Sequence, residues 1–227
     1  MKHLSKQNNF VYLFFSLIIL LLSAAVMGEL PSSFGEDFFS FLILLMLLAS
    51  IKSIHTEVTW TRTVYVVIVF FILLTLLSKF FPQSFYVHFI LITLLIFFIG
   101  SFAMAAKQVL LVGDIDGNKI IGSLTLYILL GLIWATIYLI ILATDPHAFS
   151  GIEAGHWQEI FSRVAYYSFV TLTTLGYGDI LPTNHIAEFF VYMEAIVGVF
   201  YMAIIVSSLI SLRLSALQEE KKHKKES

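Results

Sequence analysis

A short polar run that carries two glycines lies between two long apolar segments in the C-terminal half of the chain. It consists of Thr173, Thr174, Leu175, Gly176, Tyr177, Gly178 and Asp179. Because glycine has no Cβ atom, Gly176 and Gly178 can adopt positive φ angles that would strain other residues. When such residues alternate with ordinary ones, successive backbone carbonyls can point the same way. Four copies around an axis would then form stacked rings of oxygen, which can hold a dehydrated potassium ion inside a membrane.

This run resembles the selectivity filter of the tetrameric potassium channel superfamily, whose signature is Thr-x-Gly-Tyr-Gly followed by Asp. The surrounding sequence, from about 120 to 214, is similar to the helix, pore loop and helix of these channels. It carries Tyr-Ile-Leu-Leu-Gly-Leu-Ile-Trp at 127–134 and Glu-Ala-x-x-Gly at 194–198, as small prokaryotic members do. The resemblance implies passive, potassium-selective conduction. It also implies a homotetramer, because each chain supplies one pore loop and a closed ring of carbonyls needs four.

By this resemblance potassium is the permeant ion, and no cofactor is expected. The ion-binding filter positions are Thr174, Leu175, Gly176, Tyr177 and Gly178. The backbone carbonyls of 174–177 would line the ion path, and the Thr174 hydroxyl would add the innermost ring. Asp179 would lie at the outer mouth, where a carboxylate raises the local concentration of cations.

Two tyrosines upstream of the run, Tyr166 and Tyr167, occupy places where many relatives carry a pair of tryptophans. We predict that they support the filter as an aromatic cuff that braces Tyr177, each with a buried ring and a hydroxyl left to hydrogen-bond. The alternative is that both tyrosines lie at the membrane interface.

The apolar segment after the run contains a carboxylate, Glu194, which is costly in a membrane unless it faces protein or water. We predict that Glu194 supports the filter by hydrogen-bonding behind it, to Thr171 or Ser168. The alternative is that it lines the ion path and attracts ions directly. Gly198 lies one turn later, and the resemblance makes it the gating hinge of the inner helix. A glycine that packs closely against a neighbouring helix is the alternative.

The composition places most of the chain in a membrane. Of its 227 residues 59% are hydrophobic and 12% are charged, and the mean hydropathy is +0.93. A soluble domain cannot bury that much apolar surface. The lack of cysteine excludes disulfides and thiolate chemistry. The predicted fold class is an all-α membrane protein with six transmembrane helices, a re-entrant pore helix and a selectivity-filter loop.

The apolar segments predict where these elements and three domains begin and end. The six spans are predicted at 10–27, 38–54, 63–77, 84–106, 120–143 and 186–212, and the pore helix at 164–172 after a polar loop at 144–163. A peripheral four-helix bundle with a cytoplasmic elbow would cover 1–119, the pore domain 120–214 and a short basic cytoplasmic tail 215–227. A cleaved signal peptide is the alternative for the first apolar segment.

The basic residues set the expected orientation. If both termini are cytoplasmic, all lysines and arginines except Lys79 and Arg163 lie on the cytoplasmic side, as the positive-inside rule favours. The chain is therefore predicted to be a multi-pass protein of the cell membrane (plasma or inner), with 144–163 and Asp179 outside. Membrane lipids are expected partners, with the lysine-rich tail facing anionic headgroups, and no nucleic-acid partner is expected.

Two features bear on gating. The fourth predicted span, 84–106, contains no Lys or Arg, whereas a voltage sensor needs regularly spaced charges in this helix. Opening is therefore predicted to depend only weakly on voltage. His147, His156 and His185 lie on the predicted outer side, and histidine changes charge near neutral pH. A response to external pH is a further hypothesis.

Four other functions compete with a potassium channel. A poorly selective cation channel would alter the filter tyrosine, whereas Tyr177 is present. A non-conducting modulatory subunit would not need an intact Gly-Tyr-Gly, and a potassium transporter subunit would carry four degenerate pore repeats. A membrane enzyme has no support, because the sequence lacks His-Glu-x-x-His, Gly-x-Ser-x-Gly and clustered intramembrane acids.

Overall fold

A computed structural model describes residues 9–27, 32–53, 58–111, 117–153 and 155–207. Within these residues the chain forms seven α-helices, one π-helix and two very short strands. In chain order they are α1 (Asn9–Met27), α2 (Ser32–Ser53), α3 (Val58–Leu77), α4 (Gln83–Leu111), α5 (Gly117–Thr144), β1 (Phe149–Ser150), α6 (Trp157–Leu172), β2 (Leu181–Pro182), α7 (His185–Phe200) and the π-helix η1 (Tyr201–Val206). The protein is therefore mostly helical, as predicted.

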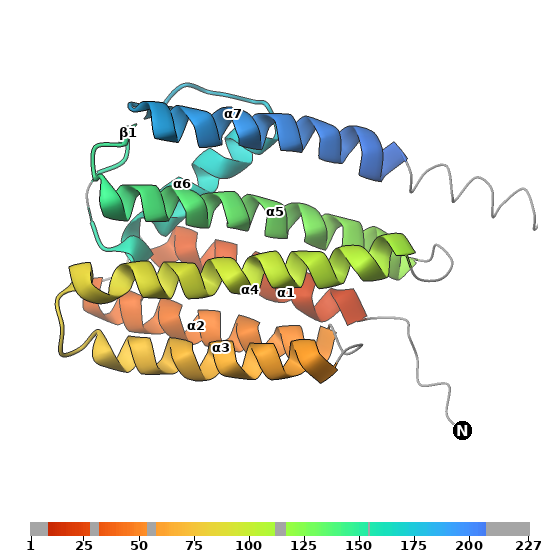
Figure 1. The fold of residues 1–227 in the computed structure, drawn as a ribbon, viewed down its shortest axis with the longest axis horizontal. Helices are drawn as coiled ribbons and strands as arrows, with labels where there is room; N and C mark the ends of the chain where they lie inside the picture. The colour runs from red at the N-terminus through yellow and green to blue at the C-terminus, as the bar shows by residue number, and fades with distance from the viewer. Residues whose placement is uncertain (1–8, 28–31, 54–57, 112–116, 154, 208–227) are drawn as a thin grey trace, which may run out of the picture.

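Helix α5 lies at the centre of the arrangement (Figure 1). It packs against α1 and α4 on one side and against α6 and α7 on the other. The long helices run roughly side by side, and the shorter α6 crosses them at an angle. Helices α2 and α3 lie farthest from α7. We call the part of the chain from α5 to α7 the C-terminal unit. The first four helices contact it chiefly through α1 and α4, and α2 also contacts α6.

Four helices of the described chain are long and apolar enough to cross a membrane. They include the segments Thr59–Leu77, Phe85–Val109, Asn118–Thr144 and His185–Ala203. An α-helix rises about 1.5 Å per residue, so roughly 20 residues match a hydrocarbon layer of about 30 Å. The apolar part of α1, Phe10–Val26, is shorter. These four helices indicate a multi-pass membrane protein. The count of six spans stays a prediction.

Aromatic packing fixes α6 against the N-terminal helices. The Phe39 ring of α2 lies 5.0 Å from that of Phe161 and 6.1 Å from that of Trp157, centroid to centroid. All three side chains are buried, so α2 and α6 share one apolar core. Such aromatic pairs stabilise a fold by about 0.5–1.5 kcal/mol beyond their buried area. This contact holds the N-terminal half of the helix that leads into the polar run.

A second apolar cluster joins five helices near the start of α1. Its buried members include Phe10, Val109, Leu130, Leu172 and Tyr201, from α1, α4, α5, α6 and the first turn of η1. The backbone N–H of Phe10 also donates to Asn118 Oδ1 at 3.2 Å, which ties the start of α1 to the start of α5. The C-terminal end of α6 is therefore packed through Leu172 into a cluster shared with α1, α4, α5 and η1.

Two predicted boundaries are wrong. Helix α6 begins at Trp157 rather than at 164, so the predicted polar loop contains two helical turns. Its first turns were hidden because exposed Glu159 and Arg163 alternate with the buried aromatic residues. Helix α4 continues to Leu111 through part of the predicted elbow. The last span is α-helical only to Phe200 and then becomes π-helical, and the remainder of that span after 207, with the basic tail, lies outside the described residues.

Strands β1 and β2 form a small ladder that was not predicted from the sequence. Phe149 pairs with Pro182 and Ser150 with Leu181 in antiparallel register. Thr183 N–H also donates to the Ala148 carbonyl at 2.9 Å. The ladder joins the loop after α5 to the loop after the polar run, so the C-terminal end of that run is anchored.

Candidate functional site

The polar run begins as the C-terminal cap of α6. Thr174 N–H donates to the Thr171 carbonyl at 2.9 Å, and Leu175 N–H donates to the Val170 carbonyl at 2.9 Å. This pair of bonds is the Schellman motif, which closes a helix around one left-handed residue. That residue is Thr174, with φ 60°. A side chain at this position costs about 1–2 kcal/mol, because its Cβ crowds the following carbonyl.

Left-handed residues then recur at every second position. Gly176 has φ 56° and Gly178 has φ 78°, whereas the non-glycine residues between them have ordinary φ values. Such alternation turns successive carbonyls toward the same side of the chain. An added Cβ at either glycine would meet nothing within 4 Å, so the backbone angle rather than crowding demands glycine there. Sequence reasoning found the two glycines but missed that Thr174 shares their conformation.

The run lies open at the edge of the molecule. In Figure 1 it passes along the outer side of α7, far from α2 and α3. All seven residues from Thr173 to Asp179 are exposed within the single chain, and Tyr177 is 66% exposed. A cavity of about 280 Å³ lies between the run, α6 and α7. The neighbouring surface of α7 is also apolar and open, with exposed Ile186, Phe189, Tyr192, Ile196, Val199 and Phe200.

The two predicted support tyrosines have different surroundings. The Tyr166 ring stacks on that of Tyr177, with centroids 6.5 Å apart and an interplanar angle of 11°. The Tyr167 ring is buried and instead contacts Tyr138 and Phe149, each at 5.5 Å. Within the described chain, only Tyr166 makes a ring contact with Tyr177. Tyr167 belongs to the packing between α5 and α6.

Asp179 lies beside a cation that the sequence did not assign to it. Arg163 Nη2 lies 3.9 Å from Asp179 Oδ2 and donates to the Gly151 carbonyl at 3.2 Å. The Arg163 guanidinium also lies 5.6 Å from the centre of the Tyr166 ring. A Cβ on Gly151 would come within 2.2 Å of the Asp179 carbonyl, so the loop after α5 approaches the run closely there. These contacts fix the backbone where the run ends.

Side-chain hydrogen bonds continue this anchoring into α7. Asn184 caps α7, since its Oδ1 accepts from Ala187 N–H at 2.8 Å. Its Nδ2 donates to Asp145 Oδ2 at 2.9 Å, just after α5. The Thr183 hydroxyl donates to the His147 carbonyl. Hydrogen bonds therefore hold the polar run at the end of α6 and at the start of α7.

Glu194 lies behind the run and is fully buried. Its Oε1 is 2.5 Å from Ser168 Oγ on α6, and its Oε2 accepts a hydrogen bond from the Tyr138 hydroxyl on α5. The predicted contact with Ser168 is present, and Tyr138 was missed because it lies on a distant segment. The alternative that Glu194 lines an open path is wrong, because none of its surface is accessible.

Gly198 packs against the end of α6. A Cβ built on it would lie 2.2 Å from the Leu172 carbonyl oxygen, which is backbone and cannot rotate away. The close approach of two helices therefore requires glycine here. The irregular part of the inner segment begins three residues later, at Tyr201. Whether the helix bends at Gly198 stays a prediction.

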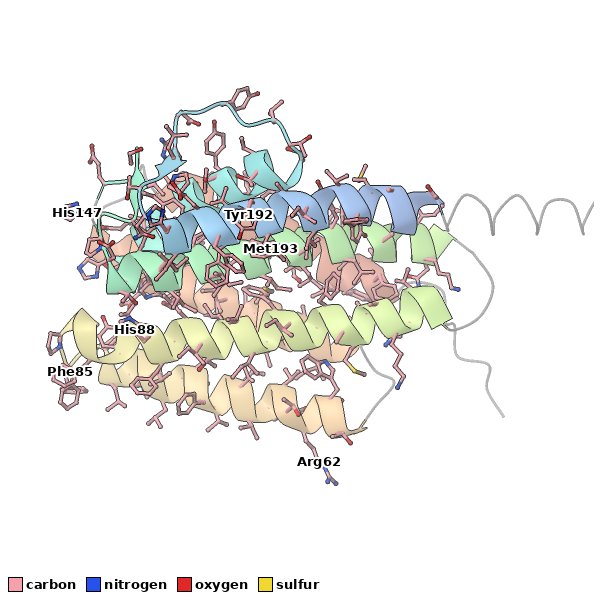
Figure 2. The ribbon with its side chains drawn as sticks, turned by 45° about the horizontal axis from the view of Figure 1, so that its top comes forward. Arg62, Phe85, His88, His147, Tyr192 and Met193 are labelled. Atoms are coloured by element: carbon pink, nitrogen blue, oxygen red, sulfur yellow. The ribbon has the colours of Figure 1, made fainter. Side chains whose placement is uncertain are left out.

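Polar groups at the loop end of the bundle link α2 to the start of α6. His156 Nδ1 lies 3.6 Å from Glu36 Oε1, and burial raises the pKa of that carboxyl while His156 opposes the shift. His88 and His147 lie at the same end, whereas Arg62 lies at the opposite end (Figure 2). No group of three or more potential metal ligands occurs among the described residues. The external pH response stays a prediction.

A comparison with protein families agrees with this geometry. The family model described as an ion channel matches residues 124–213. The matched segment holds most of α5, all of α6, the polar run and α7, which is less than half of the chain. No curated protein and no solved structure gives a significant match. The C-terminal unit is therefore similar to ion channels, which supports ion transport in a membrane rather than catalysis.

Proposed function

We propose that the protein is a potassium-selective channel that conducts passively as a homotetramer. The observation that carries this proposal is the alternation of left-handed backbone at Thr174, Gly176 and Gly178 in an open loop. Aligned carbonyls from four such loops would replace the water around a dehydrated potassium ion. In this proposal the side chains of Leu175 and Tyr177 point away from the ion path, so only their backbone carbonyls would contact the ion.

The tetramer is proposed because one chain supplies one wall of such a path. In the single chain the run is exposed, the cavity behind it is open, and the apolar residues of the adjacent α7 face are uncovered. Neighbouring copies would cover these surfaces and enclose the ion path. The first four helices, attached through α1 and α4 on the opposite side of α5, would lie at the periphery.

Electrostatics supports cation passage. Helix α6 ends at the inner end of the run, and a helix C-terminus carries a partial negative charge. Asp179 at the other end of the run would raise the cation concentration near the mouth. Ions would pass through several similar sites, so that binding is strong enough for entry and weak enough for exit. Among the described residues of α4 the basic one is Lys107, which lies near the end of the helix. This supports an opening that depends only weakly on voltage.

Purified protein in lipid vesicles tests the proposal. Potassium-loaded vesicles should release potassium much faster than matched sodium-loaded vesicles release sodium, and native mass measurement should give four chains. Tyr177→Asp should admit sodium while the tetramer persists, because it changes the filter without touching the α5–α6–α7 packing. Equal release of both ions by the wild-type protein would contradict potassium selectivity and favour a poorly selective cation channel.

A further inference from the structure

Glu194 is held among three helices without a cation to neutralise it. It lies on α7 and is 0% exposed, and within the described chain no lysine, arginine or histidine forms an ion pair with it. The groups that face it are hydroxyls: Tyr138 from α5 and Ser168 from α6, with the buried Tyr167 ring beside Tyr138. An unpaired carboxylate in such a place would be very costly.

Ser168 has too few protons to serve both of its oxygen neighbours. Its Oγ lies 2.8 Å from the Gly131 carbonyl on α5 and 2.5 Å from Glu194 Oε1. A carbonyl can only accept, and a serine hydroxyl has one proton to donate. If that proton goes to Gly131, the short contact with Glu194 needs a proton from the glutamate. If it goes to Glu194, the Gly131 carbonyl is left facing a lone pair of Oγ.

One arrangement satisfies every oxygen. Tyr138 donates to Glu194 Oε2, Glu194 Oε1–H donates to Ser168 Oγ, and Ser168 donates to the Gly131 carbonyl. We propose that Glu194 is a neutral carboxylic acid that positions the pore helix α6 by linking it to α5 and α7. It is a positioning residue, since it is separated from the exposed run by α6 itself.

The link acts where the run begins. Ser168 lies one helical turn before Leu172, and the Leu172 carbonyl is the group that Gly198 contacts. Helix α7 therefore contacts α6 at two positions, Glu194 and Gly198. Both positions precede the π-helical residues Tyr201–Val206. The residues after Gly198 can therefore move without disturbing the polar run. Loss of the Glu194 link, in contrast, would free α6, the helix that leads into the run.

Infrared spectroscopy of the full-length protein in lipid tests the proton directly. The difference spectrum of wild type minus Glu194→Gln should contain the C=O stretch of one protonated carboxyl group, shifted in D₂O, at every pH between 6 and 8. Glu188→Gln, an exposed acid on the same helix, is the matched control and should lack that band. A difference spectrum that holds only carboxylate bands would overturn the proposal.

Variants test the positioning role. Glutamine reproduces the neutral acid, because its NH₂ can donate to Ser168 while its C=O accepts from Tyr138. Glu194→Gln should therefore keep the potassium-to-sodium permeability ratio within about twofold. Glu194→Ala should lower the ratio by about tenfold, since it leaves the buried Tyr138 hydroxyl without an acceptor and removes the donor to Ser168 Oγ. A glutamine variant as impaired as the alanine variant would overturn the proposal.

The two arms separate this inference from the proposed function. The permeability arm rests on potassium conduction, whereas the infrared arm needs only folded protein. If Glu194→Ala fails to fold, the spectrum of the wild type and the rescue by Glu194→Gln still decide. A protein that shows the protonated band but conducts no ions would contradict the channel and leave the proton assignment standing.

Discussion

The polar run and the buried junction behind it are ordered by different interactions. From Thr174 to Gly178 the chain is exposed, alternates into left-handed conformations and is held mainly by backbone bonds at its start. The junction of Glu194, Ser168 and Tyr138 is buried, helical throughout and fully hydrogen-bonded. The first arrangement is unfavourable for the backbone and open to ions, and the second is favourable and closed.

The difference teaches where the stability of a strained loop originates. The left-handed conformation of Thr174 costs energy that the loop itself cannot offset, and such a residue persists only where its surroundings determine it. Here the surroundings are the α5–α6–α7 packing and the loop anchors at Asp145 and Asn184. Changes in the run should therefore affect conduction more than stability, whereas changes at the junction should affect both.

The largest effect is expected from Gly178→Ala. At φ 78° an alanine would be strained by about 1–2 kcal/mol in each subunit, so the carbonyl rings should distort and potassium flux should fall at least tenfold. The unfolding temperature should fall only by the few degrees that this strain accounts for, because no neighbouring atom clashes with the new methyl group. Gly155→Ala is the control, since Gly155 lacks a positive φ and its new Cβ would meet only side-chain atoms, Glu159 Oε2 at 3.1 Å and Ile160 Cγ2 at 3.4 Å. Normal flux from Gly178→Ala would break the comparison.

The next effect is expected from Gly198→Ala, at the junction. The new methyl group would clash with the Leu172 carbonyl, and such overpacking costs about 1–3 kcal/mol. Both the unfolding temperature in detergent and the potassium flux should fall. Val66→Ala, at an exposed position on α3 and away from the proposed subunit contacts, should leave the unfolding temperature nearly unchanged. A stable Gly198→Ala variant with reduced opening would instead identify Gly198 as the hinge.

Tyr166 lies on α6, between the polar run and the junction. Its replacement should have an intermediate effect, on ion selectivity. Tyr166→Leu removes the ring that stacks on Tyr177, a loss of about 0.5–1.5 kcal/mol, and should increase sodium permeability severalfold. Tyr166→Phe keeps the ring and should behave like the wild type. The permeability ratio of the two variants is the measurement. If phenylalanine fails as leucine does, the hydroxyl rather than the stack supports the filter.

Arg163→Gln should give the smallest effect. The Arg163–Asp179 pair is half-exposed at 3.9 Å, and such pairs contribute about 0–1 kcal/mol. Removing the positive charge should raise single-channel current at low salt by at most about twofold, and the increase should disappear as salt screens Asp179. A salt-independent loss of current would mean that Arg163 acts through the Gly151 carbonyl and the loop structure instead.

The sequence predicted what depends on local chemistry. Glycine permits positive φ, and an acid in an apolar helix needs a polar partner, so Gly176, Gly178 and a contact of Glu194 with Thr171 or Ser168 could be predicted from residue types. Contacts between distant segments did not follow. Tyr138 reaches Glu194 across 56 positions of the chain, and Arg163 meets Asp179 only because α6 begins at Trp157.

Propensity also misled at particular positions. Thr174 adopts φ 60° because the end of α6 and the two bonds around it impose that conformation, although threonine disfavours it. The adjacent Tyr166 and Tyr167 looked equivalent in sequence, yet neighbouring residues on a helix point in different directions. One therefore meets Tyr177, and the other packs on Tyr138.

The reversal potential of the purified wild-type protein in a planar bilayer tests the central claim most directly. A tenfold potassium gradient is set across the bilayer, with sodium chloride balancing the total salt. A potassium-selective pore should reverse the current about 59 mV from zero, at the potassium equilibrium potential, as a tenfold ratio requires for one charge. A reversal potential near zero would show that sodium passes equally well, and would contradict dehydration of potassium by backbone carbonyls.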